Sequence, residues 1–250
     1  MIDSHIHINS KVTKTPEREK CRITYNQQIK KVINVGLDIP TSKECVISAK
    51  RNPKIYCSVG IHPLYTDNQD YNELYEMAES NKVVAIGEIG LDKQKENFEE
   101  QKRYLIEQII IANALKIPVI IHSNNSNQEI VKIFETIVKP QYGCVFHCYQ
   151  PDLKILKYII NNGFYISFAG RVTYKNADKS IKVAKAIPDE LFLVETDSPY
   201  ISPEPVREEV NNVNNLHYIV SRLAQIKEKT FAEIEKQTEE NTLRLFKKMK

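Results

Sequence analysis

Two histidines near the start of the chain, His5 and His7, stand one residue apart, and Asp3 precedes them. Successive side chains of a β-strand alternate between its faces, so residues two apart share a face. In a strand over residues 1–7, the two imidazoles would project together and could bind a metal ion. A sheet edge could equally carry them as ordinary polar residues, because so short a motif often arises by chance.

Further histidines and carboxylates follow short runs of β-branched and apolar residues. The polar residues at or near the ends of these runs are His62, Glu88, His122, His147 and Asp197. Five of the six histidines are placed in this way, and only His217 falls in a helical pattern, so we assign it no role. Random placement would scatter histidines through helices and loops. The pattern therefore favours a metal site.

The elements that must position these residues alternate along the chain. Strands are predicted at 1–7, 31–38, 55–62, 83–90, 118–122, 144–148, 164–170 and 191–197, and the clearest helical patterns at 98–116, 214–229 and 231–249. Alternating strands and helices indicate a parallel sheet. Eight strands in 250 residues predict a (β/α)8 TIM barrel of the α/β class, spanning residues 1–250 as a single domain. An open, doubly wound sheet is the alternative, but its G-x-G-x-x-G turn is absent.

The barrel gives the ionisable residues a common position, because active sites of this fold lie at the C-terminal ends of the strands. Imidazole and carboxylate ligands suit Zn, Mn, Fe, Ni or Co, and Mg less well. Six ligands are too many for one tetrahedral site and fit two divalent metal ions about 3.5–4 Å apart. Glu88, near the middle of the strand order, is the natural bridge. Such a pair generates hydroxide at neutral pH, which is hydrolytic chemistry.

Bulk composition excludes several other classes of protein. The net charge of +3 provides no broad basic surface for coating nucleic acid, so an anionic substrate needs a local site. The first residues contain no basic segment followed by an apolar run, so we expect no signal peptide. No apolar run approaches about 18 residues, which argues against a membrane span. Five cysteines, an odd number without C-x-x-C spacing, favour a reducing cytoplasm. Cys144 and Cys148, which flank His147, are expected to pack rather than to bind metal.

The motifs themselves resemble those of one family, the TatD metal-dependent hydrolases. The match runs in order along nearly the whole chain and ends in a helix-like N-T-L-R-L-F at 241–246. The motifs are H-I-H at 5–7, G-I-H-P at 60–63, G-E-I-G-L-D at 87–92, P-V-I-I-H-S at 118–123, F-H-C at 146–148, F-A-G-R at 168–171 and E-T-D-S-P-Y at 195–200.

The resemblance implies two divalent metal ions and hydrolysis of DNA phosphodiesters, often from a 3′ end of a single strand. It implies that His5, His7, Glu88 and Asp197 hold one ion, and that Glu88 bridges to a second ion held by His122 and His147. Asp197 would also accept a proton from the attacking water. His62 would lie beside the scissile phosphate and Arg207 would bind substrate, although His62 could instead be a solvated residue at a strand end. Glu195 is expected to orient Asp197 or to pair with a buried cation.

The chain departs from the family pattern at three places, all on the substrate side. Asparagines follow His122-Ser123 at 124–125 where the family has arginine, Tyr-Gln-Pro occupies 149–151, and the basic loop after the last strand becomes the acidic 207–213. Lost cations weaken phosphate binding. Two alternatives to a DNase therefore stay open. One is a hydrolase of a small phosphoester, cyclic amide or aminoacyl ester, and the other is a nuclease subunit that docks a protein partner through the 207–213 loop.

Overall fold

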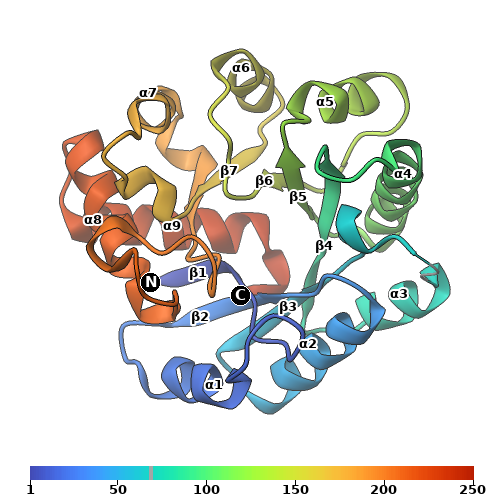
Figure 1. Ribbon diagram of the computed structural model, residues 1–250, viewed down its shortest axis with the longest axis horizontal. Coiled ribbons are helices and arrows are strands. Elements are labelled where there is room, and N and C mark those ends of the chain that lie inside the picture. Colours follow the sequence, from blue (N-terminus) through green and yellow to red (C-terminus); the bar gives the residue numbers. More distant parts are fainter. Residues whose placement is uncertain (68–69) are drawn as a thin grey trace.

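The computed structural model describes residues 1–67 and 70–250. Within these ranges, eight parallel strands are hydrogen-bonded in the order β1 to β8 and are ringed by helices (Figure 1). This is the (β/α)8 barrel that the sequence predicts, and each predicted strand is present. The strands are β1 (Ile2–Ile6), β2 (Lys31–Val35), β3 (Ile55–Val59), β4 (Val83–Asp92), β5 (Val119–Asn124), β6 (Cys144–Phe146), β7 (Tyr165–Phe168) and β8 (Phe192–Val194).

Helices connect the strands and cover the outside of the barrel. The three clearest helical patterns of the sequence correspond to α4, α8 and α9. A helix also follows β1, where residues 8–23 show only a weak helical pattern in the sequence. The α-helices are α1 (Pro16–Tyr25), α2 (Ile39–Arg51), α3 (Tyr71–Ala78), α4 (Phe98–Leu115), α5 (Asn127–Thr136), α6 (Leu153–Asn161), α7 (Asp178–Ala186), α8 (Leu216–Lys227) and α9 (Phe231–Leu245).

Several helices begin at side chains that satisfy their free backbone N–H groups. The Asp38 carboxylate accepts from Thr41 N and the Thr41 side chain accepts from Asp38 N, a capping box that starts α2 directly after β2. Asp152 accepts from Lys154 N and Ile155 N at the start of α6. These caps fix the point at which the chain leaves each strand end, and hence the loops that surround the barrel mouth.

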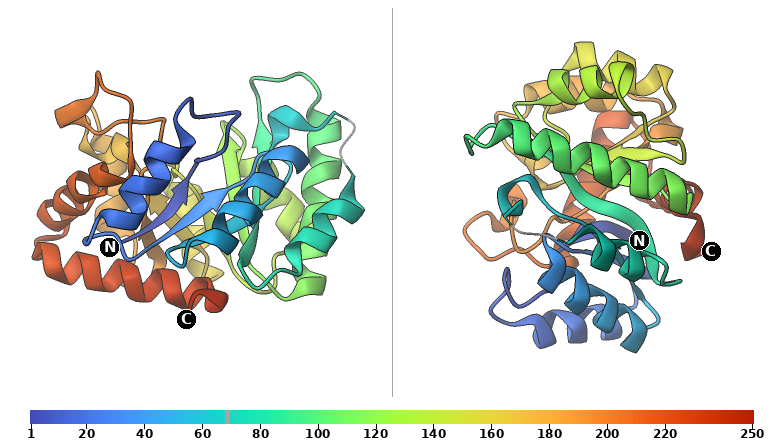
Figure 2. Two further views of the ribbon diagram at one scale, coloured as in Figure 1. Left: turned by 90° about the horizontal axis from the view of Figure 1, so that it is seen from below. Right: turned by 90° about the vertical axis from the view of Figure 1, so that its right-hand side faces the viewer.

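The barrel interior is filled by side chains drawn from most of the strands. Strand β4 is buried along its whole length, as expected for a parallel strand covered on both faces. The helix α9 lies beneath the strands, at the end of the barrel opposite the mouth (Figure 2). The interior cluster comprises Ile2, Ile33, Val35, Val84, Ala85, Ile120, Val145, Tyr165, Leu193, Leu245, Phe246 and Met249.

The first strand and the segment after the last strand join through backbone hydrogen bonds. Asp197 N donates to His5 O at 2.9 Å, and His7 N donates to Ser198 O at 2.8 Å. These bonds bring the two ends of the strand order together, so that residues from β1 and from the end of β8 share one site. In the described residues, no helix is both long enough and apolar enough to cross a membrane.

Candidate active site

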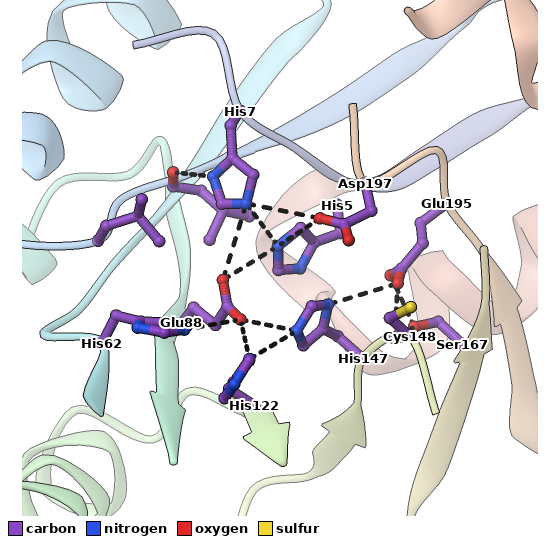
Figure 3. Close-up of polar contacts among 12 residues, drawn as sticks. His5, His7, His62, Glu88, His122, His147, Cys148, Ser167, Glu195 and Asp197 are labelled. Carbon is purple, nitrogen blue, oxygen red and sulfur yellow. Dashed lines mark hydrogen bonds and ion pairs between the residues drawn. The ribbon is translucent and has the colours of Figure 1, made fainter. Parts of the chain in front are cut away.

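Every residue that the sequence proposed as a metal ligand lies at the mouth of the barrel (Figure 3). His5 lies within β1, Glu88 within β4 and His122 within β5, while the other three ligands follow the ends of β1, β6 and β8. His5 is fully buried, and His7, Glu88 and Asp197 are each at most 5% exposed. Residues up to 192 positions apart in the sequence therefore converge on one largely buried cluster, whose members are His5, His7, Glu88, His122, His147 and Asp197.

The Glu88 carboxylate stands at the centre of this cluster, and its two oxygens face different histidines. Oε2 lies 3.3 Å from His5 Nε2 and 3.7 Å from His7 Nε2. Oε1 lies 2.7 Å from His122 Nδ1 and 2.6 Å from His147 Nε2. One carboxylate thus connects two separate pairs of imidazole nitrogens, which is the arrangement of a bridging ligand.

Asp197 completes the first of the two groups. Its Oδ1 lies 3.8 Å from His5 Nε2 and 3.6 Å from His7 Nε2. Asp197 holds a left-handed backbone conformation, with φ of 54°, which is uncommon for a residue other than glycine. Asp3 holds the residue before Asp197 in place, because its carboxylate accepts hydrogen bonds from both the backbone N and the hydroxyl of Thr196. Full burial raises the pKa of Asp3 to about 7, against the effect of these hydrogen bonds.

The rings are oriented by hydrogen bonds on their outer nitrogens. His7 Nδ1 lies 3.0 Å from Val35 O, an acceptor, so Nδ1 carries the ring hydrogen and Nε2 presents a lone pair to the cluster. His122 is reversed: its Nε2 lies 2.9 Å from Asp92 Oδ2, and Nδ1 faces Glu88. A carboxylate behind a histidine is a common support for metal-binding rings.

Glu195 lies behind His147 at ion-pair distance, without a hydrogen bond to the ring. Its Oε1 lies 3.5 Å from His147 Nδ1 and accepts from Cys148 N at 2.6 Å, while Oε2 accepts from Ser167 Oγ at 2.6 Å. The sequence analysis expected Glu195 to orient Asp197 or to pair with a cation. The structure instead directs its carboxylate at His147.

The charges of the cluster suit cations. Although burial alone would raise the pKa of Glu88, the surrounding histidines hold it well below its ordinary value. Burial lowers the pKa of His147, but Glu88 and Glu195 outweigh it and raise that pKa well above the ordinary value. His5 Nε2 and His7 Nε2 approach within 3.2 Å, and the buried nitrogens His5 Nδ1 and His147 Nδ1 have no hydrogen-bond partner among the described residues. Converging lone pairs and ionised carboxylates in a buried site fit divalent metal ions, and imidazole with carboxylate is a ligand set that suits transition metals.

His62 differs from the other histidines of the cluster. Its Nδ1 accepts a hydrogen bond from Leu64 N at 3.1 Å, so the hydrogen of the neutral ring lies on Nε2. That N–H group points towards Glu88 Oε1, 3.5 Å away. Burial lowers the pKa of His62 to about 4, and His122 adds to the effect. Although His62 Nε2, Glu88 and His122 are close enough together to hold an ion, a protonated Nε2 is a donor and not a ligand.

The cluster opens into a cavity of about 430 Å³. Tyr65 and Tyr200 lie on its wall, and Tyr200 is half exposed. Arg171 is the one arginine or lysine among the described residues that line it, against the carboxylates of Glu88, Asp92 and Asp197. This excess of negative charge would repel an anionic substrate unless cations are bound.

Comparison with known proteins supports the resemblance that the motifs carry. The family model described as TatD related DNase matches residues 2–247. The chain belongs to the TatD family. It is 32% identical over 252 residues to YabD of Bacillus subtilis, named a metal-dependent hydrolase, with 99% of each chain covered. A metal-dependent hydrolase of Buchnera aphidicola is 34% identical over 255 residues, covering 98% of this chain and 96% of that protein.

Solved structures show the same fold. The TatD homologue YJJV of Escherichia coli superposes with a TM-score of 0.88 at 24% identity, and covers 99% of this chain and 98% of its own. A TatD family hydrolase of Entamoeba histolytica gives a TM-score of 0.83 at 20% identity, with 98% and 97% covered. The chain is therefore a metal-dependent hydrolase of the TatD family with a TIM-barrel fold.

The structure places two of the three departures from the TatD pattern beside the cavity. Asn124 and Gln150 line it, and Gln150 Nε2 donates to Asn124 Oδ1 at 3.1 Å. Arg207 is not among the described residues lining the cavity. Its guanidinium lies over the Tyr174 ring, 3.7 Å from the ring centroid, and contacts Glu204. Asn211 is buried and donates to Thr196 O and Tyr200 O, which ties the 207–213 loop to the segment that carries Asp197.

Two residues of the site were missed by the sequence analysis. Asp92 and Arg171 both occur in the motifs quoted for the family, yet neither was given a role. Asp92 ends the strand that carries Glu88 and is four residues further along it, so it shares a face with Glu88 in an alternating strand. That spacing was a usable signal, whereas the position of Arg171 beside the cavity depends on the chain path after β7.

Proposed function

We propose that this TatD protein binds two divalent metal ions and hydrolyses phosphodiester bonds of single-stranded DNA from the 3′ end. The observation that carries the proposal is the Glu88 carboxylate, whose two oxygens face two separate pairs of histidine nitrogens. His5, His7 and Asp197 would hold one ion, His122 and His147 the other, and Glu88 both. Bound metal ions lower the pKa of a water molecule and neutralise the charge of the phosphate.

The protein's own side chains carry out the proton transfer and position the substrate. Asp197, at the inner edge of the cavity, accepts the proton released by the attacking water. His62 donates its Nε2 hydrogen to an oxygen of the scissile phosphate, because Leu64 N holds Nδ1 as an acceptor. Arg171 lies on the cavity wall, where it can pair with a phosphate oxygen. Tyr65 and Tyr200 offer ring faces on which a terminal base can stack.

The test is digestion of single-stranded DNA in Mg²⁺ or Mn²⁺, with wild type beside Glu88→Ala. A strand labelled at its 5′ end should yield a ladder of shortened products, and a circular single strand should stay intact. Glu88→Ala should abolish the ladder, whereas Glu135→Ala, which removes an exposed carboxylate from α5, should preserve it. Cleavage of the circle would contradict exonuclease action. No cleavage of any strand by metal-loaded protein would overturn DNA as the substrate.

A second candidate, hydrolysis of a small phosphoester, cyclic amide or aminoacyl ester, is favoured by one observation. Arg171 alone supplies a basic side chain among the described residues lining the cavity, and asparagine stands at 124 and 125. Turnover of such small substrates without any cleavage of DNA would select this function instead.

The third candidate is a nuclease subunit with a protein partner. The 207–213 loop exposes Glu208, Glu209 and Val210, the last of which is 75% exposed. This candidate predicts little activity for the isolated chain, so strong activity of a monomer in gel filtration would exclude it.

A further inference from the structure

A second cavity of about 320 Å³ adjoins the catalytic cavity. It lies where the loops after β4, β5 and β6 meet the first residues of α5 and the residue that caps α6. Half of its lining residues carry a side-chain carboxamide, so we name it the carboxamide cleft. It is lined by Lys93, Asn125, Asn127, Gln128, Glu129, Gln150, Pro151 and Asp152. Gln150 lines both cavities, so the cleft and the catalytic cavity share a wall.

The cleft contains a polar atom with no hydrogen-bond partner in the part of the chain that the structure describes. Asn127 is only 8% exposed, and its Nδ2 donates to Gln150 O at 3.4 Å. Its Oδ1 is buried and accepts no hydrogen bond. A buried acceptor without a donor costs free energy, and most such atoms in proteins are paired. Because this oxygen has almost no accessible surface, a ligand in the cleft that donates a hydrogen bond would reach it after a rotation of the Asn127 carboxamide.

The charges of the cleft argue against an anionic ligand. Lys93 already pairs with Glu129 Oε1 at 2.5 Å. Asp152 uses its carboxylate to cap α6, and it adds a second negative charge to the wall. Two carboxylates against one ammonium group would repel a phosphate. Carboxamides carry both donors and acceptors, and they pair with the edges of nucleobases, which also carry both.

The wall between the two cavities is fixed to the active site. Gln150 Oε1 accepts from Asn125 N at 3.1 Å, and its Nε2 donates to Asn124 Oδ1 at 3.1 Å. Asn124 Nδ2 in turn donates to Asp92 Oδ1 at 3.2 Å, and the other oxygen of Asp92 contacts His122. A ligand that spans both cavities is therefore held in a defined position relative to the metal-binding histidines.

We propose that the carboxamide cleft binds the nucleobase of the nucleotide next to the scissile bond, through the side chains of Asn127 and Gln128. The inference rests on the proposed DNase function and specifies how that function recognises its substrate. Binding of a base in this cleft would explain how the protein holds a DNA strand although asparagine replaces the family's arginine at 124–125. Contacts to a neutral base take over part of the binding that cationic contacts to phosphate supply elsewhere.

The experiment compares two single-stranded oligonucleotides that differ at one position. One is intact, and the other carries an abasic residue as the second nucleotide from its 3′ end. Wild-type protein, Asn127→Ala, Gln128→Ala and the control Gln141→Ala are assayed with both. Gln141 is an exposed glutamine before β6, at the opposite end of the barrel. KM and kcat are measured with Mn²⁺, and equilibrium binding of the oligonucleotides is measured by fluorescence anisotropy with Ca²⁺ in place of Mn²⁺, so that the negative charge of the cavity stays neutralised. A melting curve for each variant verifies folding.

Wild-type protein and Gln141→Ala should bind the intact strand roughly fivefold or more tightly than the abasic strand, the gain expected for one good carboxamide–base pair. Asn127→Ala and Gln128→Ala should bind both strands equally, with KM raised only for the intact strand. If the nuclease is active but these variants discriminate as wild type does, the inference is wrong and the proposed function stands. If neither strand is bound or cleaved by wild type, the proposed function fails and the inference fails with it. If Lys93→Ala lowers the affinity for both strands equally, while Asn127→Ala and Gln128→Ala leave both affinities unchanged, the cleft holds a phosphate instead.

Discussion

Asp92 Oδ2 lies 2.9 Å from His122 Nε2, so the carboxylate that ends β4 fixes the ring of the histidine on β5. His122 consequently presents Nδ1 to Glu88, whereas His5, His7 and His147 present Nε2. Two carboxylates four residues apart on one strand thus contact opposite nitrogens of the same imidazole ring. The alignment of β4 with β5 therefore determines which nitrogen of His122 faces the proposed metal site.

We expect Asp92→Asn to weaken Mn²⁺ binding by about 10- to 100-fold, the usual effect of removing such a support. The amide cannot supply the negative charge that raises the basicity of the ring. Isothermal titration calorimetry should detect the loss, and Asp178→Asn, at an exposed carboxylate of α7, should bind as wild type does. Equal affinity in Asp92→Asn and wild type would mean that the carboxylate has no part in metal binding.

The two groups around Glu88 predict the number of bound ions. Wild type should retain two equivalents of Mn²⁺ after gel filtration, measured by inductively coupled plasma mass spectrometry. His7→Ala and His122→Ala should each retain about one, because each removes a ligand from a different group, and Glu88→Ala should weaken both. His217→Ala, which alters a half-buried histidine of α8, serves as the control. A single equivalent in wild type would contradict the two-metal proposal.

The strands and the ligand cluster could be predicted because a parallel barrel produces a regular pattern in the sequence. Parallel strands covered on both faces appear as short apolar runs, and the histidines at their ends then share one mouth. The helix α1 left a weaker trace. Its buried residues are Ile23 and Glu19, and a buried glutamate interrupts an apolar pattern. Glu19 is buried because Oε1 accepts from Val213 N and Oε2 accepts from Arg22, a pairing with the distant 207–213 loop.

The substrate side of the site could be predicted less well, because it is built from loops. Arg207 has the charge expected of a phosphate ligand, but its guanidinium stacks on Tyr174 outside the residues that line the cavity. Arg171 reaches the cavity through the 3₁₀ turn Gly170–Thr173, whose direction depends on tertiary contacts. Similarly, the partner of Glu195 depends on how β6, β7 and β8 bring Cys148, Ser167 and Glu195 together, and alternation along one strand cannot reveal it.

The two arginines can be separated by kinetics. Arg171→Ala should raise KM for an oligonucleotide about tenfold, if one phosphate contact worth about 1.4 kcal/mol is lost. It should also reduce the dependence of binding on salt concentration, because fewer counterions are then released. Arg207→Ala, an exposed arginine paired with Glu204, should have a smaller effect on both. A larger effect at Arg207 would restore the role that the family resemblance gave it.

The cap of α2 predicts how stability depends on pH. Burial alone would raise the pKa of Asp38, but hydrogen bonds from Lys11 and Thr41 outweigh it and lower the pKa below 3.8. A carboxyl with a lowered pKa in the folded state stabilises the protein above its unfolded pKa, and that stabilisation is lost as the pH falls through the folded value. Asp38→Ala should therefore cost about 1 kcal/mol in the free energy of unfolding at pH 7, as for other helix caps.

This difference between wild type and Asp38→Ala should shrink as the pH falls below 3.8 and through the lower pKa of the folded state, where the wild-type carboxyl becomes protonated and loses its ion pair with Lys11. Urea unfolding at pH values from 7 down to about 2 measures the difference. Gln141→Ala, which removes an exposed side chain with no titratable group, is the control. A difference that stays constant over this range would mean that hydrogen bonds of the neutral side chain, and not its charge, stabilise the start of α2.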